Sequence, residues 1–392
     1  MLRCNILTIF LAFSLLAGAQ DWKVVRENPQ KAFPKTVAAG NYSGIAHLHD
    51  DIYAVVSDKS DSALYFNFRI QVNPKTGELE QVENLGFTER TDGTLNDGKP
   101  WQGLEKGFDH EAIVKVSDST LVIASEGYCR LKEYPVLPTS ANAPKISYQQ
   151  TLWESRWPSS DFYPNYNFES LAFDSIRLYL WTIPESTLRK DGQPATPQNG
   201  LANQLRLMRL DWGKIKENRN KEDNGKEDSS EQVSSKKDSR YMTTYAYQMD
   251  QPSTHKKADI YVMGVSELCA LPDGQLLVLE REAFIPKIKI GAFCKCKLYL
   301  INPLNSGEFS TDEKSSMKEK FSSDTPFLKK RLLTEWKTGL SLSKRSFANY
   351  EGMCLGPKLE DGSQVVILLS DSQDQYAGVL KDWFKTIVIR KE

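Results

Sequence analysis

The chain has 392 residues, with 50 basic and 51 acidic side chains, a formal net charge of −1 and 40% hydrophobic residues. Such a length allows about two or three ordinary domains or a single closed repeat. The balanced charge provides no basic surface for nucleic acid, so we expect no nucleic-acid partner. After the first 19 residues no stretch approaches the twenty or so apolar residues that a membrane-spanning helix needs, and we expect no transmembrane segment.

Residues 1–19 have the composition of a secretory signal peptide. Arg3 supplies an early positive charge, residues 6–16 are mostly apolar, and small residues end the segment at Ala19. We therefore expect cleavage near Ala19 and a secreted or periplasmic protein. Its mature part, 20–392, is predicted to be a single domain.

One pattern recurs five times in the mature chain: a short apolar run, a turn and a second apolar run. A polar or acidic residue opens each copy, and a charged residue ends it. The copies span 43–58, 111–126, 169–185, 266–281 and 351–371. Short strands repeating at intervals of about 55 to 95 residues are typical of β-propeller blades, each a four-stranded sheet. We predict an all-β fold, a five-bladed β-propeller, with a six-bladed one as the alternative.

The two ends of the chain are predicted to pair. Residues 22–25 are a strand candidate without a blade of their own, and 384–390 would be the third strand of the last blade. An N-terminal strand closing the last blade leaves no open sheet edge. Two insertions interrupt the repeat. Segment 214–240 is a charged low-complexity stretch that cannot bury enough apolar surface to order itself, and 305–329 is a milder stretch of that kind.

The residues that open the five copies should meet at the centre of this fold, because the innermost strand of each blade faces the channel. They are Ser43, Glu111, Glu169, either Ser266 or Glu267, and Glu351. Carboxylates gathered in this way stay ionised only where a cation or a shared proton relieves their repulsion. Oxygen ligands without histidine or thiolate partners favour calcium, so a Ca²⁺ ion on the axis is the predicted cofactor.

The residues that end the copies should lie on the same rim, because the start of the first strand and the end of the second meet at one edge of a hairpin. A carboxylate beside a cation can act as a base, and basic side chains match the oxygens of an anionic substrate. We predict a catalytic group of Glu126, Glu280, Asp371 and His110, which adjoins Glu111. We predict a substrate-binding group of Asp58, Lys59, Arg130, Glu185, Arg281 and Gln373.

The five motifs together resemble the phytase-like domain family, also described as the esterase-like activity of phytase family. The resemblance rests on Ser-Gly with Ser-Asp-Lys, Glu-Ala-Ile with Ser-Glu-Gly, Asn-Phe-Glu-Ser-Leu-Ala, Val-Ser-Glu-Leu with Leu-Glu-Arg, and Asn-Tyr-Glu-Gly-Met with Ser-Asp-Ser-Gln. It covers about 41–390 and implies a secreted or periplasmic propeller that hydrolyses phosphate or carboxylic esters. The chain departs from the family pattern at His110, where Pro is common, and at 372–373, where Asp-Asn is usual.

A more distant likeness, to the five-bladed calcium-activated nucleotidases (apyrases), concerns only the order of the axial residues. Ser43, Glu111, Glu169, Ser266 and Glu351 match the Ser, Glu, Glu, Ser, Glu calcium ligand set of that family, which favours Ser266 over Glu267. We therefore predict a monomeric calcium-dependent hydrolase that acts on a small phosphate or carboxylic ester. The alternatives are a non-catalytic binding propeller with a structural calcium, and a lactonase.

Overall fold

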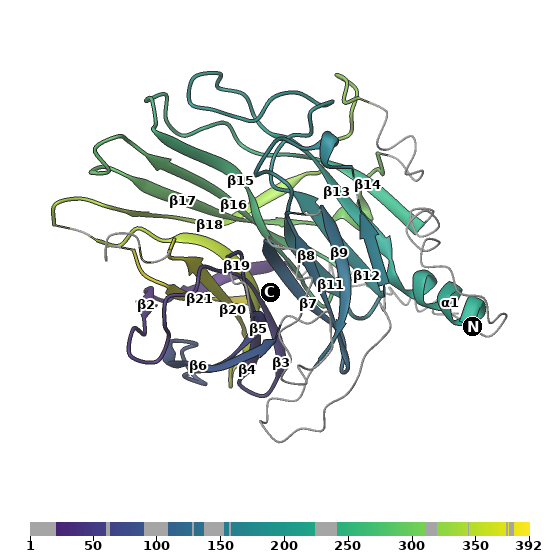
Figure 1. The fold of residues 1–392 in the computed structure, drawn as a ribbon, viewed down its shortest axis with the longest axis horizontal. Helices are drawn as coiled ribbons and strands as arrows, with labels where there is room; N and C mark the ends of the chain where they lie inside the picture. The colour runs from purple at the N-terminus through teal and green to yellow at the C-terminus, as the bar shows by residue number, and fades with distance from the viewer. Residues whose placement is uncertain are drawn as a thin grey trace, which may run out of the picture.

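The computed structural model describes residues 21–59, 63–89, 109–127, 129–136, 153–156, 158–223, 241–309, 320–343, 345–373, 375 and 380–392. In these ranges the strands form five antiparallel sheets arranged around a common centre (Figure 1). The prediction of a five-bladed β-propeller is thus confirmed, and the six-bladed alternative is wrong. The predicted signal peptide, 1–19, lies outside the described residues.

Each of the first four blades is built from four strands that follow one another in the chain and in the sheet. Blade one contains β3 (Tyr42–His49), β4 (Ile52–Ser57), β5 (Ala63–Val72) and β6 (Leu79–Glu89). Blade two contains β7 (His110–Ser117), β8 (Thr120–Ser125), β9 (Arg130–Pro135) and β10 (Trp153–Arg156). Blade three contains β11 (Phe168–Asp174), β12 (Tyr179–Pro184), β13 (Gln204–Asp211) and β14 (Met242–Gln248). Blade four contains β15 (Ile260–Ala270), β16 (Leu276–Ile285), β17 (Phe293–Ile301) and β18 (Lys330–Gly339).

Blade five joins the two ends of the chain. Its strands are β19 (Asn349–Lys358), β20 (Gln364–Asp371), β21 (Trp383–Lys391) and the N-terminal β1 (Trp22–Glu27), and the short β2 (Lys31–Ala32) also pairs with β21. In Figure 1 the purple N-terminal segment lies beside the yellow C-terminal strands. The predicted closure of the last blade is confirmed. It protects the edge of β21, which would otherwise be open to pairing.

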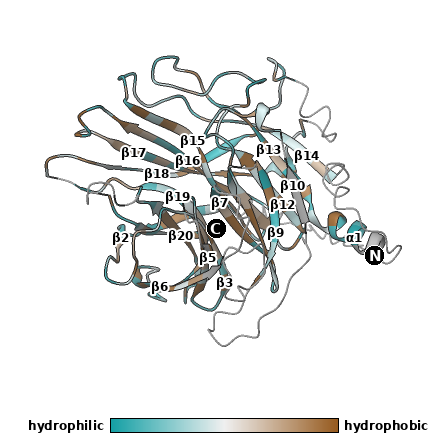
Figure 2. Ribbon diagram, viewed as in Figure 1, coloured by the Kyte–Doolittle hydropathy of each residue, from teal (hydrophilic) through white to brown (hydrophobic). Residues whose placement is uncertain are grey.

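Five hydrophobic clusters hold the blades together, one at each interface between neighbours. At the interface of blades four and five, for example, Leu279 and Leu298 pack with Met353 and Leu368. The brown, hydrophobic segments in Figure 2 accordingly lie along the strands. Because both faces of each sheet are covered by neighbouring blades, the strands are apolar on both sides and their polar residues gather at the ends.

The insertion after β13 is more ordered than its composition suggested. Helix α1 (Trp212–Asp223) follows β13 directly, with Trp212 and Ile215 buried against blades two and three. Arg219 Nη1 lies 2.9 Å from Oε2 of the buried Glu133. The expectation that no structure forms from residue 214 onwards is therefore wrong up to residue 223, while 224–240 lie outside the described residues.

The second insertion joins β17 to β18, and its described flanks pack on blade three. The 3₁₀ helix Pro303–Asn305 starts it, and a second 3₁₀ helix, Ser159–Asp161, precedes blade three. The rings of Phe309 and Phe321 meet at 5.1 Å and cover the guanidinium of Arg206. Among the described residues we find no helix with the length and apolar character to cross a membrane.

Candidate functional site

The first strand of every blade carries a β-bulge at the same place. Between the flanking residue pairs, the first strand has one residue more than the second. The bulges contain Ser43 with Gly44 in β3, Glu111 in β7, Glu169 in β11, Ser266 in β15 and Glu351 in β19. A bulge redirects a side chain from the regular alternation of its strand and is common beside functional sites. The five predicted axial residues thus occupy equivalent positions.

These first strands form a closed ring. Strand β3 contacts β7 and β19, β11 contacts β7 and β15, and β15 contacts β19. Strands β3 and β7 approach each other so closely that a Cβ on Gly44 would lie 2.6 Å from the backbone oxygen of Glu111 in the next blade. The ring brings together five bulges that are separated by tens of residues in the chain.

A second ring lies at the level where the second strands of blades one, two, three and five end, and where β16 of blade four passes through Arg281. Its members are Asp58, Glu126, Glu185, Arg281 and Asp371. The backbone N–H groups of Asp58, Glu126 and Glu185 each donate to the residue that precedes the first strand of their blade, at 3.3, 2.8 and 2.7 Å. Arg281 pairs with Gly264, and Asp371 with Asn349, at the same level. Four blades therefore place a carboxylate at this position, and blade four places a guanidinium.

The Arg281 side chain is 3% exposed and lies among three carboxylates. It forms ion pairs with Glu169, at 3.2 Å, and with Glu185 and Glu351. Its Nη1 also donates to Oδ1 of Asn349 at 3.1 Å. Both terminal nitrogens are thus engaged with the protein, so this arrangement does not offer Arg281 to a substrate as the sequence predicted.

Among the described residues no buried guanidinium pairs with Glu111, although the exposed Lys59 pairs with its neighbour Asp58 at 3.1 Å. Glu111 is 8% exposed, and one ligand atom each of Glu111, Asp58 and Asp109 lie within 4.8 Å of one another. Two oxygens bound to the same Ca²⁺ at about 2.4 Å can be separated by at most about 4.8 Å. The donor set is composed only of carboxylates, which suits a hard divalent cation. These three residues therefore fit a Ca²⁺ ion.

Burial raises the pKa values of Glu111, Glu169 and Glu351 in the first ring and of Glu126, Glu185 and Asp371 in the second. Desolvation, followed by the charges of Glu169 and Glu351, raises the pKa of Glu111 well above its usual range. Desolvation raises the pKa of Glu126 to about 7, although the N–H of Asn167, at 3.1 Å, partly opposes it. The pKa of Glu351 also rises to about 7 through burial, despite Arg281. At neutral pH such a cluster holds protons or binds cations.

The phytase-like family model, described as "Esterase-like activity of phytase", matches residues 37–373. The chain belongs to this phytase-like family. No match was found among curated proteins.

Several solved structures are similar to this phytase-like chain. A streptogramin B lyase structure is 10% identical, with 93% of this chain and 98% of the lyase covered and a TM-score of 0.31. An endo-arabinase from Bacteroides thetaiotaomicron is 8% identical, with 91% and 95% covered and a TM-score of 0.39. A virginiamycin B lyase from Staphylococcus aureus is 8% identical, with 94% and 99% covered and a TM-score of 0.31.

Lys59 is an exposed cation at the rim of the site in this phytase-like protein. Its side chain is 47% exposed, and its Nζ lies 3.1 Å from Asp58 Oδ2 and 3.4 Å from Gln373 Oε1. The backbone N–H of Gln373 donates in turn to Asp371 at 2.8 Å. Asp371 itself is buried, and desolvation followed by the charges of Glu351 and Asp58 raises its pKa well above the usual range. Lys59, Gln373 and Asp371 thus lie close together in the structure.

The structure does not bring Glu280 into the site. Its carboxylate accepts hydrogen bonds from Tyr247, at 2.7 Å, and Lys330, at 2.6 Å. Since neighbouring residues in a strand point to opposite faces, Glu280 and the adjacent Arg281 cannot both face the axis. The expected place of Glu280 on the rim of the channel is wrong.

Four other predicted residues contact their own blade or its neighbour. His110 is buried with its ring centroid 6.4 Å from that of Tyr134, and Arg130 is buried at the start of β9. The hydroxyl of Ser43 donates to the carbonyl of His110 at 2.7 Å, and that of Ser266 to the carbonyl of Leu279 at 3.4 Å.

The sequence prediction missed Asp109 and Asn349. Each stands two residues before the polar residue that opens its copy, as do Asn41 and Asn167. This shared offset was visible in the sequence. Its meaning was not, because only the closed ring of first strands brings these positions of different blades together.

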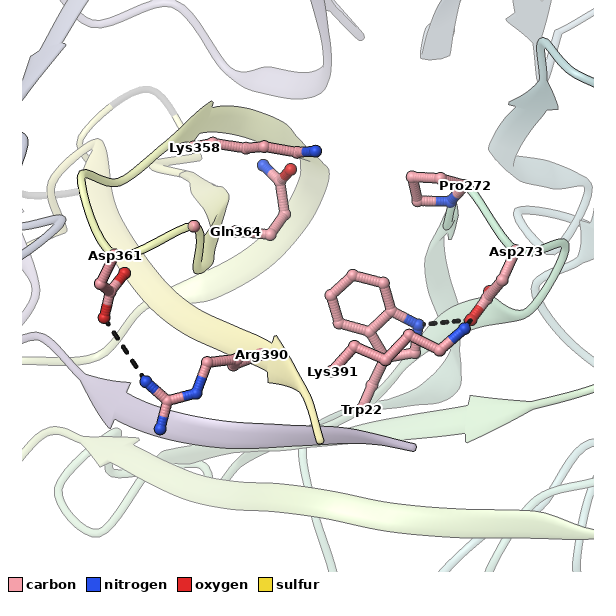
Figure 3. Close-up of a pocket in the computed structure, with 9 residues that line it drawn as sticks. Trp22, Pro272, Asp273, Lys358, Asp361, Gln364, Arg390 and Lys391 are labelled. Atoms are coloured by element: carbon pink, nitrogen blue, oxygen red, sulfur yellow. Dashed lines mark hydrogen bonds and ion pairs between the residues drawn. The ribbon is translucent and has the colours of Figure 1, made fainter. Parts of the chain in front are cut away.

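A separate pocket of about 490 Å³ lies at the other end of β19 (Figure 3). Lys358, Gln364, Arg390 and Lys391 line it together with Trp22. The indole Nε1 of Trp22 donates to Asp273 at 2.7 Å, and Lys391 also pairs with Asp273, at 2.8 Å. These contacts attach the N-terminal strand β1 to blade four. They lie at the seam of the propeller, by which we mean the place where blade five, built from both ends of the chain, meets blade four.

Proposed function

We propose that this protein is a calcium-dependent hydrolase of phosphate or carboxylic esters, with its site at the acidic end of the propeller axis. One observation carries the proposal: Glu111 is a nearly buried carboxylate, beside Asp58 and Asp109, in a cluster whose buried cation is engaged elsewhere. The name of the family, esterase-like activity of phytase, supports the same class of reaction. Secretion, suggested by 1–19, would expose the site to abundant calcium.

Glu111, Asp58 and Asp109 would hold the cation. When bound, Ca²⁺ supplies positive charge that polarises a phosphoryl or acyl oxygen of the substrate and lowers the pKa of a ligated water. The chain's own contribution is to keep three oxygens close together before the ion arrives, because bulges and backbone hydrogen bonds position them. Of the five axial ligands that the sequence predicted, this proposal retains Glu111. In this structure Glu169 and Glu351 pair with Arg281 instead.

Glu126 is the proposed general base. A base works best when its pKa lies close to the working pH, and burial raises the pKa of Glu126 to about 7. Its carboxyl is oriented by the N–H of Asn167 and remains partly exposed, so a water molecule can reach it. Glu126 would accept a proton from the attacking water and return it to the departing alkoxide.

Lys59 is the proposed contact for an anionic substrate. Its ammonium group lies at the rim, half exposed, beside the acidic cluster. A phosphate ester entering a site rich in carboxylates needs such a positive charge, since it would otherwise be repelled.

The test is hydrolysis of 4-nitrophenyl phosphate and 4-nitrophenyl acetate by the purified protein, with Ca²⁺ and with a chelator. Glu111→Gln and Glu126→Gln should each lower kcat by about 100-fold or more with the fold retained. Asp118→Asn is the matched control, because Asp118 is fully exposed just beyond the opposite end of β7 from Glu111. Absence of turnover of both esters in the calcium-loaded protein would reject the proposed function.

A binding propeller with a structural cation is the second candidate. Arg281 favours it, because one buried guanidinium already links carboxylates from blades three and five to blade four. In that case Ca²⁺ would raise thermal stability, while neither ester would be hydrolysed. Opening of a lactone without ester cleavage would instead identify a lactonase.

A further inference from the structure

Arg281 breaks the pattern of the second ring in a way that its surroundings explain. The other four blades place Asp58, Glu126, Glu185 and Asp371 at the equivalent position, where Arg281 stands in blade four. The bulge of blade four likewise carries Ser266 in place of a carboxylate. Blade four thus contributes no negative charge to either ring, and it contributes the positive charge.

The guanidinium occupies a cage of oxygens. Carboxylates of Glu169 and Glu185 reach it from blade three, and the carboxylate of Glu351 and the amide oxygen of Asn349 reach it from blade five. Carboxylate and amide oxygens are also the ligands that Ca²⁺ prefers. The same cage would accept a metal ion if the guanidinium were absent.

Gly264, which pairs with Arg281 across the hairpin, leaves room for the side chain of Glu185, one of the carboxylates that pair with Arg281. A Cβ on Gly264 would lie 2.3 Å from Cγ of Glu185, so a larger residue would displace one of the carboxylates of the cage. The equivalent positions in the other blades hold Asn41, Asp109, Asn167 and Asn349. Blade four thus differs from the other blades at both members of this residue pair, with glycine on the first strand and arginine on the second.

We propose that Arg281 is a built-in cation that takes the place of a second metal ion and so limits the acidic cluster to one divalent cation. The inference depends on the proposed function, in which Glu111, Asp58 and Asp109 hold that cation. Removal of the guanidinium would leave three carboxyl groups and an amide oxygen close together without a positive charge, so the emptied cage would favour binding of a cation. Arg281 acts here as a positioning residue, because it orients carboxylates and does not contact the substrate.

The arrangement has a consequence for the metal-free protein. A guanidinium attached to β16 cannot dissociate, so it holds blades three, four and five together whether or not calcium is present. A chelator should therefore remove the ion at Glu111 and leave the rest of the cluster in place.

The test is the number of calcium ions bound per chain, measured by titrating the metal-free full-length protein with CaCl₂ in a calorimeter and by equilibrium dialysis. We expect one ion for the native chain, two for Arg281→Gln, and one for Arg281→Lys, which retains the charge. Arg331→Gln is the matched control, because Arg331 is a half-exposed arginine in blade four that pairs with Asp21. It should bind one ion.

The outcomes separate this inference from the proposed function. A native chain that binds no ion would reject the cation of the proposed function, and one additional ion in Arg281→Gln would still support the role of Arg281. Equal numbers of ions in the native chain and Arg281→Gln would overturn the inference. If Arg281→Gln unfolds in chelator, circular dichroism with added CaCl₂ decides: recovery of the fold supports the inference, and no recovery overturns it.

Discussion

The carboxyl of Glu267 in blade four accepts the backbone N–H of Leu171 in blade three at 2.9 Å. The N–H of Leu268, at 2.9 Å, donates to the same oxygen, and Met353 of blade five supplies a further N–H. The side chain is 1% exposed, and desolvation raises its pKa well above the usual range. One side chain thus joins the first strands of three blades.

Replacement of Glu267 should separate a loss of hydrogen bonding from a loss of charge. Glu267→Ala leaves buried N–H groups without an acceptor and should lower the free energy of unfolding by about 3 kcal/mol. Glu267→Gln keeps an acceptor oxygen and should cost less than about 1.5 kcal/mol. Urea unfolding of the two variants measures both values. Equal losses would mean that the charge, and not the acceptor, is what the blades require.

The metal-free protein should become less stable as the pH rises from about 4.5 to about 7. The folded pKa values of Glu126 and Glu351 are raised to about 7, so the folded state retains protons that the unfolded state has released. The stability is complete below the unfolded pKa and is lost as the pH passes through the folded one. Calcium should accordingly raise Tm more at pH 7.5 than at pH 5, as measured by differential scanning fluorimetry. A larger rise at pH 5 would contradict this.

Glu280→Gln should destabilise the fold and spare the site. The substitution removes a buried charge that pairs with Lys330 and Tyr247, which should cost about 3 kcal/mol. Calcium affinity should stay within about twofold of the native value, since Glu280 lies on the face of β16 opposite to Arg281. Thermal unfolding and calorimetric titration of the same sample test both parts. A loss of calcium binding at unchanged stability would show that Glu280 belongs to the calcium site on the axis.

Lys59→Ala should distinguish the two ester classes under the proposed function. The variant loses the exposed positive charge that would contact a phosphate, so KM for 4-nitrophenyl phosphate should rise about tenfold. KM for the uncharged 4-nitrophenyl acetate should change less than about twofold. Lys75→Ala, in the exposed turn between β5 and β6, is the control and should change neither value. Equal changes in KM for both esters would show that Lys59 does not contact the phosphate of the substrate.

Trp22→Phe should weaken the seam of the propeller. Phenylalanine retains most of the packing but loses the hydrogen bond to Asp273, which Figure 3 shows joining β1 to blade four. The free energy of unfolding should fall by about 1 kcal/mol, measured by urea denaturation. Asp273 keeps its pairing with Lys391, so a loss much above that value would show that the indole also supports the closure by packing.

Local patterns in the sequence determined the class of fold and the number of blades. Apolar runs of strand length, separated by turns and repeated five times, can bury their surface only as stacked sheets, and the bounds of β21 follow the predicted strand 384–390 closely. The polar residue that opens each copy was also recognisable, because it interrupts an apolar strand. The sequence did not reveal helix α1, whose order depends on Trp212 and Ile215 packing on blades two and three and on ion pairs with Glu133.

Tertiary structure alone decided which charged residue of blade four faces the axis. In the sequence Glu280 and Arg281 are neighbours near the end of one copy, and both were expected at the rim, Glu280 as a catalytic residue and Arg281 as a substrate-binding residue. In the sheet Arg281 pairs with Gly264, at the level where Asp371 pairs with Asn349 in blade five, and Glu280 pairs with Val265 one position away, so Arg281 faces the centre and Glu280 faces away from it. Side-chain direction in a strand reverses with every residue, so only one of two adjacent charged residues faces the centre. Which of them does so decides whether blade four contributes an acid or a base there.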